Sequence, residues 1–215
     1  MERRHILISG AAVALLAAGG GFGLLWRNGQ AEDNFKADET GVFEGDRILG
    51  DPDAPITIIE YSSLTCPHCA AFHAETMPEI KKKWIEEGKA RLVYRHFPFD
   101  ALGTYAALAA NCVEGDRHFG FIDILFRNQA RWTRAQDPRA AIAQMAALAG
   151  IDKASLEACV QDETALVKIQ KLRQYGSEEY GINSTPSFII NGKKLVGNQG
   201  LEKFEQALQD AGSQS

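Results

Sequence analysis

The sequence has no strongly basic stretch, and its 28 acidic residues outnumber its 23 lysines and arginines, which leaves a formal net charge of −5 at pH 7. A protein that binds nucleic acid needs concentrated positive charge to contact the phosphates. The composition therefore argues against a nucleic-acid partner. The sequence also lacks an internal repeat, and outside its N-terminal segment it has no low-complexity tract. A repeat architecture is excluded by this absence.

Cysteine is scarce, with only four residues, Cys66, Cys69, Cys112 and Cys159. A structural zinc site needs four ligands, usually supplied as two closely spaced pairs. The first two cysteines make one such pair, but the other two stand alone and far along the chain. His68 and His73 could supplement a site, yet both fall on the same short predicted helix as the first pair. We therefore expect no metal.

Cys66-Pro67-His68-Cys69 follows an apolar, β-branched run at 56–61 and leads into a helix-like stretch. A C-x-x-C at a strand-to-helix junction is typical of a thioredoxin-like redox site. Cys66 would lie at the helix N-terminus, where free N–H groups and the helix dipole favour the thiolate that attacks disulfides. Two intervening residues keep Cys69 close enough to resolve a mixed disulfide. His68 adds a polar neighbour that can become cationic.

Residues 1–31 have the pattern of an export segment. Arg3 and Arg4 precede an uncharged apolar run from Ile6 to Trp26, and a charged lead before an apolar middle is typical of a signal peptide. The run is also long enough to span a membrane. A cleaved signal and a single-span anchor are therefore both open. The basic pair places the rest of the chain outside the cytoplasm, in the periplasm or a comparable space, free or tethered to the inner membrane.

The remaining chain is predicted to be one α/β unit interrupted by helices. The predicted order is a polar linker at 32–42, a strand at 56–61, a helix from Cys66 to about Glu87, a strand at 90–97, four or five helices between about 102 and 176, a hairpin at 187–197 and a final helix at 201–209. Pro78 should kink or split the first helix. Residues 43–98 and 177–212 would then form a thioredoxin-like domain, with 99–176 as an inserted helical domain.

Three features together resemble the DsbA family of extracytoplasmic thiol:disulfide oxidoreductases. They are Glu60-x5-Cys66-Pro67-His68-Cys69, the helical insertion, and Thr185-Pro186 before the hairpin. The lead-in at 49–55 is similar as well, and the resemblance covers about residues 43–210. It implies a monomer without a cofactor that introduces disulfides into reduced or unfolded exported proteins. A quinone-linked membrane partner would reoxidise it.

The resemblance also assigns roles to single residues. Cys66 corresponds to the family's exposed nucleophile and Cys69 to its buried resolving cysteine, with Pro67-His68 as the family's dipeptide between them. Pro186 corresponds to a cis proline that faces the cysteine pair, and the hydroxyl of Thr185 would lie near the sulfur. Glu60 would lie beneath Cys69, where a buried carboxylate can accept the proton of that cysteine.

Cys112 and Cys159 are expected to form a disulfide, because a cysteine pair in an exported chain most often does. Some members of the family carry a second disulfide in the helical domain, which favours the bridge over two separate buried thiols. Two other functions remain open: a disulfide reductase or isomerase, and a non-catalytic module that binds a metal or a partner. Family isomerases carry an N-terminal dimerisation domain, for which residues 28–42 leave no room, so we expect an oxidase.

Overall fold

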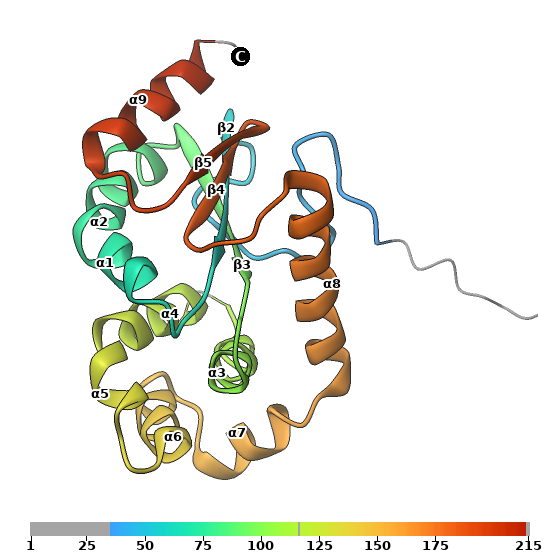
Figure 1. Ribbon diagram of the computed structural model, residues 1–215, viewed down its shortest axis with the longest axis vertical. Helices are drawn as coiled ribbons and strands as arrows, with labels where there is room; N and C mark the ends of the chain where they lie inside the picture. The colour runs from blue at the N-terminus through green and yellow to red at the C-terminus, as the bar shows by residue number, and fades with distance from the viewer. Residues whose placement is uncertain (1–34, 116, 214–215) are drawn as a thin grey trace, which may run out of the picture. The chain divides into compact units, whose positions relative to one another are not determined.

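The computed structural model describes residues 35–115 and 117–213, so the export segment predicted at 1–31 lies outside the described residues. A sheet of five strands is the centre of the fold, in the order β1-β3-β2-β4-β5 (Figure 1). The strands are β1 (Ile48–Leu49), β2 (Ile56–Ser62), β3 (Ala90–His96), β4 (Ser187–Ile190) and β5 (Lys193–Val196). β2 and β3 are parallel, and the other neighbours pair antiparallel.

β2 lies in the centre of the sheet because its apolar side chains point to both faces. All seven of its residues are buried. Ile56 and Ile58 belong to the core on one face of the sheet, whereas Ile59 and Tyr61 belong to the core on the other. A strand without polar alternation fits only where both faces are covered, and the prediction of such a strand at 56–61 is confirmed.

Helices cover both faces of the sheet (Figure 1). On one face lie α1 (Pro67–Glu75), α2 (Met77–Ile80), the π-helix η1 (Lys81–Ile85) and α9 (Leu201–Gly212). Pro78 stands in the first turn of α2, so the predicted split of the long helix is confirmed. On the other face lies α8 (Glu163–Tyr180), where a Cβ atom on Gly176 would come within 2.5 Å of the Tyr61 ring. Glycine at this position lets the helix approach the sheet closely.

Among the described residues between β3 and β4 there are six helices, not four or five. They are α3 (Ala101–Asn111), α4 (Arg117–Arg127), α5 (Gln129–Thr133), α6 (Pro138–Leu148), α7 (Lys153–Cys159) and α8. The count was underestimated because α5 has only five residues, too few to show a period.

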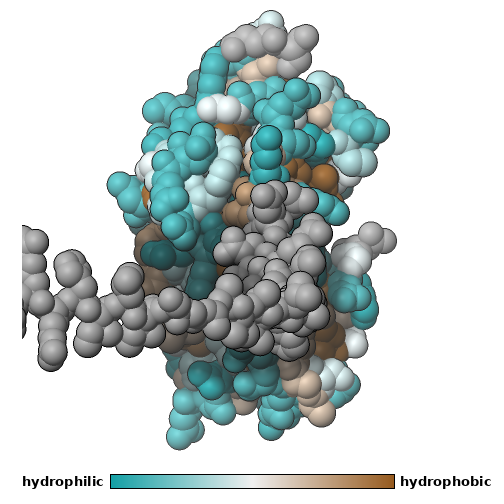
Figure 2. Space-filling view, turned by 90° about the vertical axis from the view of Figure 1, so that its right-hand side faces the viewer, coloured by the Kyte–Doolittle hydropathy of each residue, from teal (hydrophilic) through white to brown (hydrophobic). Residues whose placement is uncertain are grey.

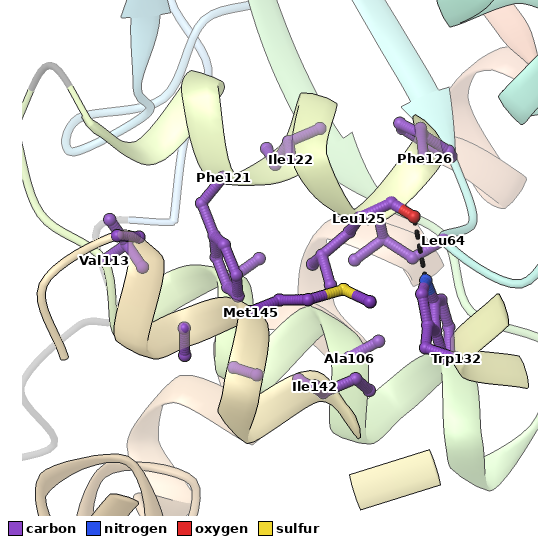
Figure 3. Packing of buried hydrophobic residues seen from close by; sticks show 14 of the residues in the cluster. Leu64, Ala106, Val113, Phe121, Ile122, Leu125, Phe126, Trp132, Ile142 and Met145 are labelled. Atoms are coloured by element: carbon purple, nitrogen blue, oxygen red, sulfur yellow. Dashed lines mark hydrogen bonds between the residues drawn. The ribbon is translucent and has the colours of Figure 1, made fainter. Parts of the chain in front are cut away.

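The helical region has its own core, in which Phe121, Ile142 and Met145 are buried (Figure 3). Trp132 is fully buried there, and its indole Nε1 donates a hydrogen bond to the carbonyl of Leu125 at 2.8 Å. A disulfide joins Cys112, at the end of α3, to Cys159, at the end of α7. The same core includes Leu64 and Cys69, so it is continuous with the C-x-x-C segment.

The helices α3–α7 gather beyond the end of the sheet at which β2 leads into α1 (Figure 1). The surface of the molecule on the side of α8 is largely hydrophilic where it is visible (Figure 2). Only Ile169, Leu172 and Gly176 of α8 are buried. No helix within the described residues is long and apolar enough to cross a bilayer.

Candidate active site

The C-x-x-C segment occupies the junction between β2 and α1. Cys66 is the N-cap of α1, with extended backbone angles (φ −81°, ψ 120°), and Pro67 follows at the first helical position. Proline is well suited to that position because its missing N–H would have no helical partner. Pro67 and His68 are exposed, Cys66 is half-buried and Cys69 is buried. The helix therefore presents the first sulfur and encloses the second.

The surroundings of Cys66 stabilise its thiolate. The pKa of Cys66 is lowered to about 5, chiefly by a hydrogen bond from the Cys69 side chain. Burial of the sulfur raises the pKa and so opposes this shift. The Thr185 side chain and the backbone N–H groups of Cys69 and His68 lower the pKa further. His68 thus acts on the sulfur through its backbone N–H, while its ring is exposed. The sequence had suggested its ring as the source of the effect.

Cys69 is affected in the opposite direction. Burial raises its pKa far above the ordinary value, the interaction with Cys66 raises it further, and the side chain of Ser62 acts in the other direction. Cys69 is fully buried, and both sulfurs are free thiols in this structure. The two thiols therefore differ in acidity, and the more accessible one more readily forms the thiolate.

Thr185 and Pro186 are brought to the cysteine pair from 119 residues away. The peptide bond between them is cis. The Sγ of Cys66 donates a hydrogen bond to the carbonyl oxygen of Thr185 at 3.3 Å. Pro186 is buried, and its carbonyl accepts a hydrogen bond from the N–H of Gly197 at 2.8 Å. The segment before β4 therefore forms one wall of the site.

Glu60 is fully buried on β2, but its partner is not a cysteine. Its Oε1 is hydrogen-bonded to Nε2 of His73 at 2.9 Å, and both side chains are inaccessible or nearly so. Cys69 has Cys66 and Ser62 as its polar neighbours instead. Sequence reasoning considered His73 only as a metal ligand. The signal that could have identified His73 is its spacing from Cys69, because residues four positions apart lie on the same face of a helix.

Gln129 and Asp100 fix the loop before the helix, and sequence reasoning missed both. Nε2 of Gln129 donates to the carbonyl oxygens of Leu64 at 2.8 Å and Cys66 at 2.9 Å. Asp100 Oδ2 accepts a hydrogen bond from Thr65 Oγ1 at 2.8 Å. The helical region therefore holds the cysteine loop in place. No local pattern could have revealed these contacts, because they join residues 35 or more positions apart.

A cavity of about 420 Å³ opens beside Pro67, between the cysteine loop and the helical region. It is lined by Thr65, Pro67, Asp100, Leu102, Gln129, Ala130, Thr133 and Arg134. Such a groove could receive a segment of another chain next to Cys66. Within residues 35–115 and 117–213, no group of three or more His, Cys, Asp or Glu side chains is arranged to hold a metal ion.

A helix-capping thiolate, a buried second thiol and a cis proline opposite them define a dithiol protein of the thioredoxin fold. The family model described as thioredoxin matches residues 43–210. The structure of α-DsbA1 from Wolbachia pipientis is 31% identical, with a TM-score of 0.74 over 80% of this chain and 94% of that one. The chain belongs to the thioredoxin family, as a DsbA-like member.

Two further proteins are similar to this chain. BdbD from Bacillus subtilis has a TM-score of 0.73 at 22% identity over 80% of this chain and 95% of that one, and it shares the fold. A Rickettsia bellii protein, provisionally named a protein-disulfide oxidoreductase, is 29% identical over 171 residues, or 79% of this chain. The alignment spans 66% of that protein and 61% of its Rickettsia felis counterpart, less than two thirds of each.

Proposed function

We propose that the protein is a thiol:disulfide oxidoreductase that introduces disulfide bonds into reduced or unfolded exported proteins through Cys66-Pro67-His68-Cys69. The observation that carries the proposal is that the pKa values of the two thiols are shifted in opposite directions. The pKa of Cys66 is lowered to about 5, whereas burial raises that of Cys69. A stabilised Cys66 thiolate favours the reduced form of the pair, so the oxidised pair tends to pass its disulfide on.

The reaction follows from that asymmetry. A substrate thiolate attacks Sγ of Cys66, the bond between Cys66 and Cys69 breaks, and Cys69 leaves and takes up a proton. A second substrate thiolate then attacks the substrate sulfur of the mixed disulfide, and Cys66 leaves as its stabilised thiolate. The substrate has lost two electrons and two thiol protons, and the cysteine pair has been reduced.

The walls of the site support specific auxiliary roles. The backbone at Thr185-Pro186 would pair with an extended substrate, as in strand addition, because the Thr185 carbonyl already lies 3.3 Å from the sulfur of Cys66. The cavity beside Pro67 would receive flanking substrate residues. Glu60 would exchange a proton with Cys69, since it is buried on the adjoining strand.

Partners and location follow from the same proposal. The protein would act as a monomer in the periplasm or a comparable extracytoplasmic space, with a signal peptide or a single-span anchor in residues 1–31. It would need no cofactor, and a membrane reoxidase would restore its disulfide. Oxidising compartments are where disulfides form and persist.

The deciding experiment is the reduction potential of the Cys66–Cys69 pair, measured by equilibration with glutathione. Each unit by which a nucleophilic thiol is acidified corresponds to about 1.4 kcal/mol, or about 30 mV in a two-electron couple. We therefore expect a value well above the ~−270 mV of thioredoxin and towards the ~−120 mV of DsbA. A potential at or below that of thioredoxin would support the reductase alternative and exclude the oxidase.

A further inference from the structure

A buried acid–base pair lies behind the reactive cysteines. Glu60 comes from β2 and His73 from α1, one helical turn beyond Cys69. Their hydrogen bond joins Oε1 to Nε2 at 2.9 Å. The second carboxylate oxygen of Glu60, Oε2, is buried and has no hydrogen-bond partner among the described residues. One oxygen is thus held by the imidazole, and the other remains available to accept a proton.

Tyr94 lies beside this pair and within electrostatic range of Cys69. It lies opposite Glu60 in the register of β2 and β3, and the rings of Tyr94 and His73 meet edge to face with centroids 6.1 Å apart. Burial raises the pKa of Tyr94, and the charges of Glu60 and then Cys69 add to the effect. Glu60 and Cys69 are therefore both within electrostatic range of one phenol.

A second cavity reaches His73 from behind α1. Its volume is about 420 Å³, and His73 and Tyr94 form part of its wall. It shares no lining residue with the groove beside Pro67. Lys81 from η1 and the ion pair of Asp123 with Arg127 from α4 supply its charged wall. A cavity of this size readily admits water or a small solute.

We propose that His73 passes the proton of Cys69 between Glu60 and this rear cavity, so that the proton exchanges with solvent behind α1 and not through the substrate groove. The inference rests on the proposed function and adds a route to it. A protein substrate joined to Cys66 covers the groove, yet Cys69 must gain a proton when it leaves and lose one when it attacks. A separate route allows both transfers while the substrate is bound.

In the resolving step, in which Cys69 attacks the mixed disulfide at Cys66, the proton and the electron pair move as follows. The thiol proton of Cys69 passes to Glu60, and the Cys69 thiolate attacks Sγ of Cys66. The new sulfur–sulfur bond forms as the bond from Cys66 to the leaving sulfur breaks, and that sulfur departs with the electron pair. An imidazole can accept a proton on one ring nitrogen and release it from the other. With Nε2 bonded to Glu60, the proton would leave His73 from Nδ1.

The titrating groups around the pair come from every element that packs on it. They are Glu60 on β2, Tyr94 on β3, Cys66 at the N-cap of α1, Cys69 and His73 on α1, Lys81 on η1, and Asp123 and Arg127 on α4. A pH profile alone would mix their contributions. The test must therefore isolate the imidazole by chemical rescue.

The test measures the resolving step alone, in the full chain. Reaction of the reduced protein with 5,5′-dithiobis(2-nitrobenzoate) forms a mixed disulfide at Cys66, with release of one thionitrobenzoate. Attack by Cys69 then releases the second. His73→Gln keeps a hydrogen-bonding group against Glu60 but cannot relay a proton. His73→Ala opens space beside the cavity for added imidazole. Met77→Leu, also on the cavity wall, is the matched control.

We expect His73→Gln and His73→Ala to slow the second release by about 10²-fold, the usual contribution of a positioned proton-transfer group. The first release should keep the wild-type rate, and so should both releases in Met77→Leu. Imidazole should restore His73→Ala in a saturable manner and leave His73→Gln unchanged.

Two outcomes would overturn the route. One is a wild-type rate of second release in His73→Gln between pH 5 and 9. The other is a slow His73→Ala that imidazole does not rescue, which would mark the histidine as structural. Either result leaves the oxidase proposal intact, because the resolving step occurs in oxidases and reductases alike. The oxidase proposal fails on the reduction potential, which this measurement does not use.

Discussion

The two cysteine pairs occupy opposite ends of their helices. Cys66 caps the N-terminus of α1, whereas Cys112 caps the C-terminus of α3 and Cys159 is the last residue of α7. The positive end of the helix dipole stabilises a thiolate, and the negative end destabilises it. Thiol–disulfide exchange requires a thiolate. The same residue type is therefore reactive in one pair and expected to be inert in the other.

Exposure does not explain the difference between the pairs. Cys66, Cys112 and Cys159 are all half-buried. What differs is the set of hydrogen-bond donors: the Sγ of Cys66 receives hydrogen bonds from the Cys69 side chain and from backbone N–H groups, whereas the Sγ of Cys112 lies 3.2 Å from the carbonyl oxygen of Leu108. The comparison teaches that the hydrogen-bond donors around the sulfur, and not its access to solvent, lower the pKa of Cys66.

The largest contrast should appear in activity. Cys66→Ala should abolish oxidation of a reduced, unfolded protein substrate, because it removes the only stabilised thiolate of the pair. The double variant Cys112→Ala, Cys159→Ala should retain the wild-type rate at a temperature where it is folded. The measurement is the rate of substrate thiol loss. Comparable losses in the two variants would show that the second pair takes part in catalysis.

For stability the second pair, Cys112 and Cys159, should matter more than the first. Removing the Cys112–Cys159 bridge, which closes a loop of 47 residues, should lower the free energy of unfolding by about 4 kcal/mol in the chain-entropy model. Urea titration checks this, with Cys66 and Cys69 replaced by alanine in both proteins so that only one bridge varies. A change below about 1 kcal/mol would mean that the bridge constrains little of the unfolded chain.

Alkylation should separate the two active-site sulfurs. Cys66 should react with iodoacetamide with a midpoint near pH 5, in keeping with its lowered pKa, whereas buried Cys69 should stay unmodified. In the unfolded chain both should show the ordinary midpoint of about 8.5. Mass spectrometry of each peptide over pH 4–9 makes the measurement. A folded-state midpoint near 8.5 for Cys66 would remove the basis of the oxidase proposal.

The pH dependence of the free energy of unfolding should also reflect the lowered pKa of Cys66. The pKa of Cys66 is about 5 in the folded state, below its ordinary value of about 8.5, so its thiolate stabilises the folded reduced protein. That contribution is fully present above about pH 8.5 and is lost as the pH falls through about 5. Reduced protein should therefore gain stability relative to reduced Cys66→Ser as the pH rises between these limits. Parallel curves for the two proteins would contradict the assignment.

The smallest effect should come from Thr185→Val. The Thr185 side chain is a minor cause of the low pKa of Cys66, after the hydrogen bond from Cys69. Valine retains the shape but removes the hydroxyl, so the alkylation midpoint should rise by less than that seen on unfolding. Thr185→Ser, which keeps the hydroxyl, is the control. Equal midpoints in the serine and valine variants would assign the effect to Cys69 and the backbone N–H groups alone.

Several elements were predictable because their signals are local. The buried run at 56–61, the turn at Asn191-Gly192 and the break at Pro78 each depend on a few neighbouring residues, and β2, the β4–β5 hairpin and α2 lie where they were expected. β1 was missed because two residues show no periodicity. The number of helices was wrong because short helices such as α5 do not reach a full amphipathic repeat.

The sequence by itself placed the pair Cys66 and Cys69 at a strand-to-helix junction, because their spacing and their flanking elements are properties of adjacent residues. Only the tertiary structure decided what surrounds them. His73, not Cys69, bonds Glu60, and Gln129 holds the carbonyl of Cys66 across 63 residues. Such contacts depend on how the helices pack against the sheet, and packing is a property of the whole core that no local pattern carries.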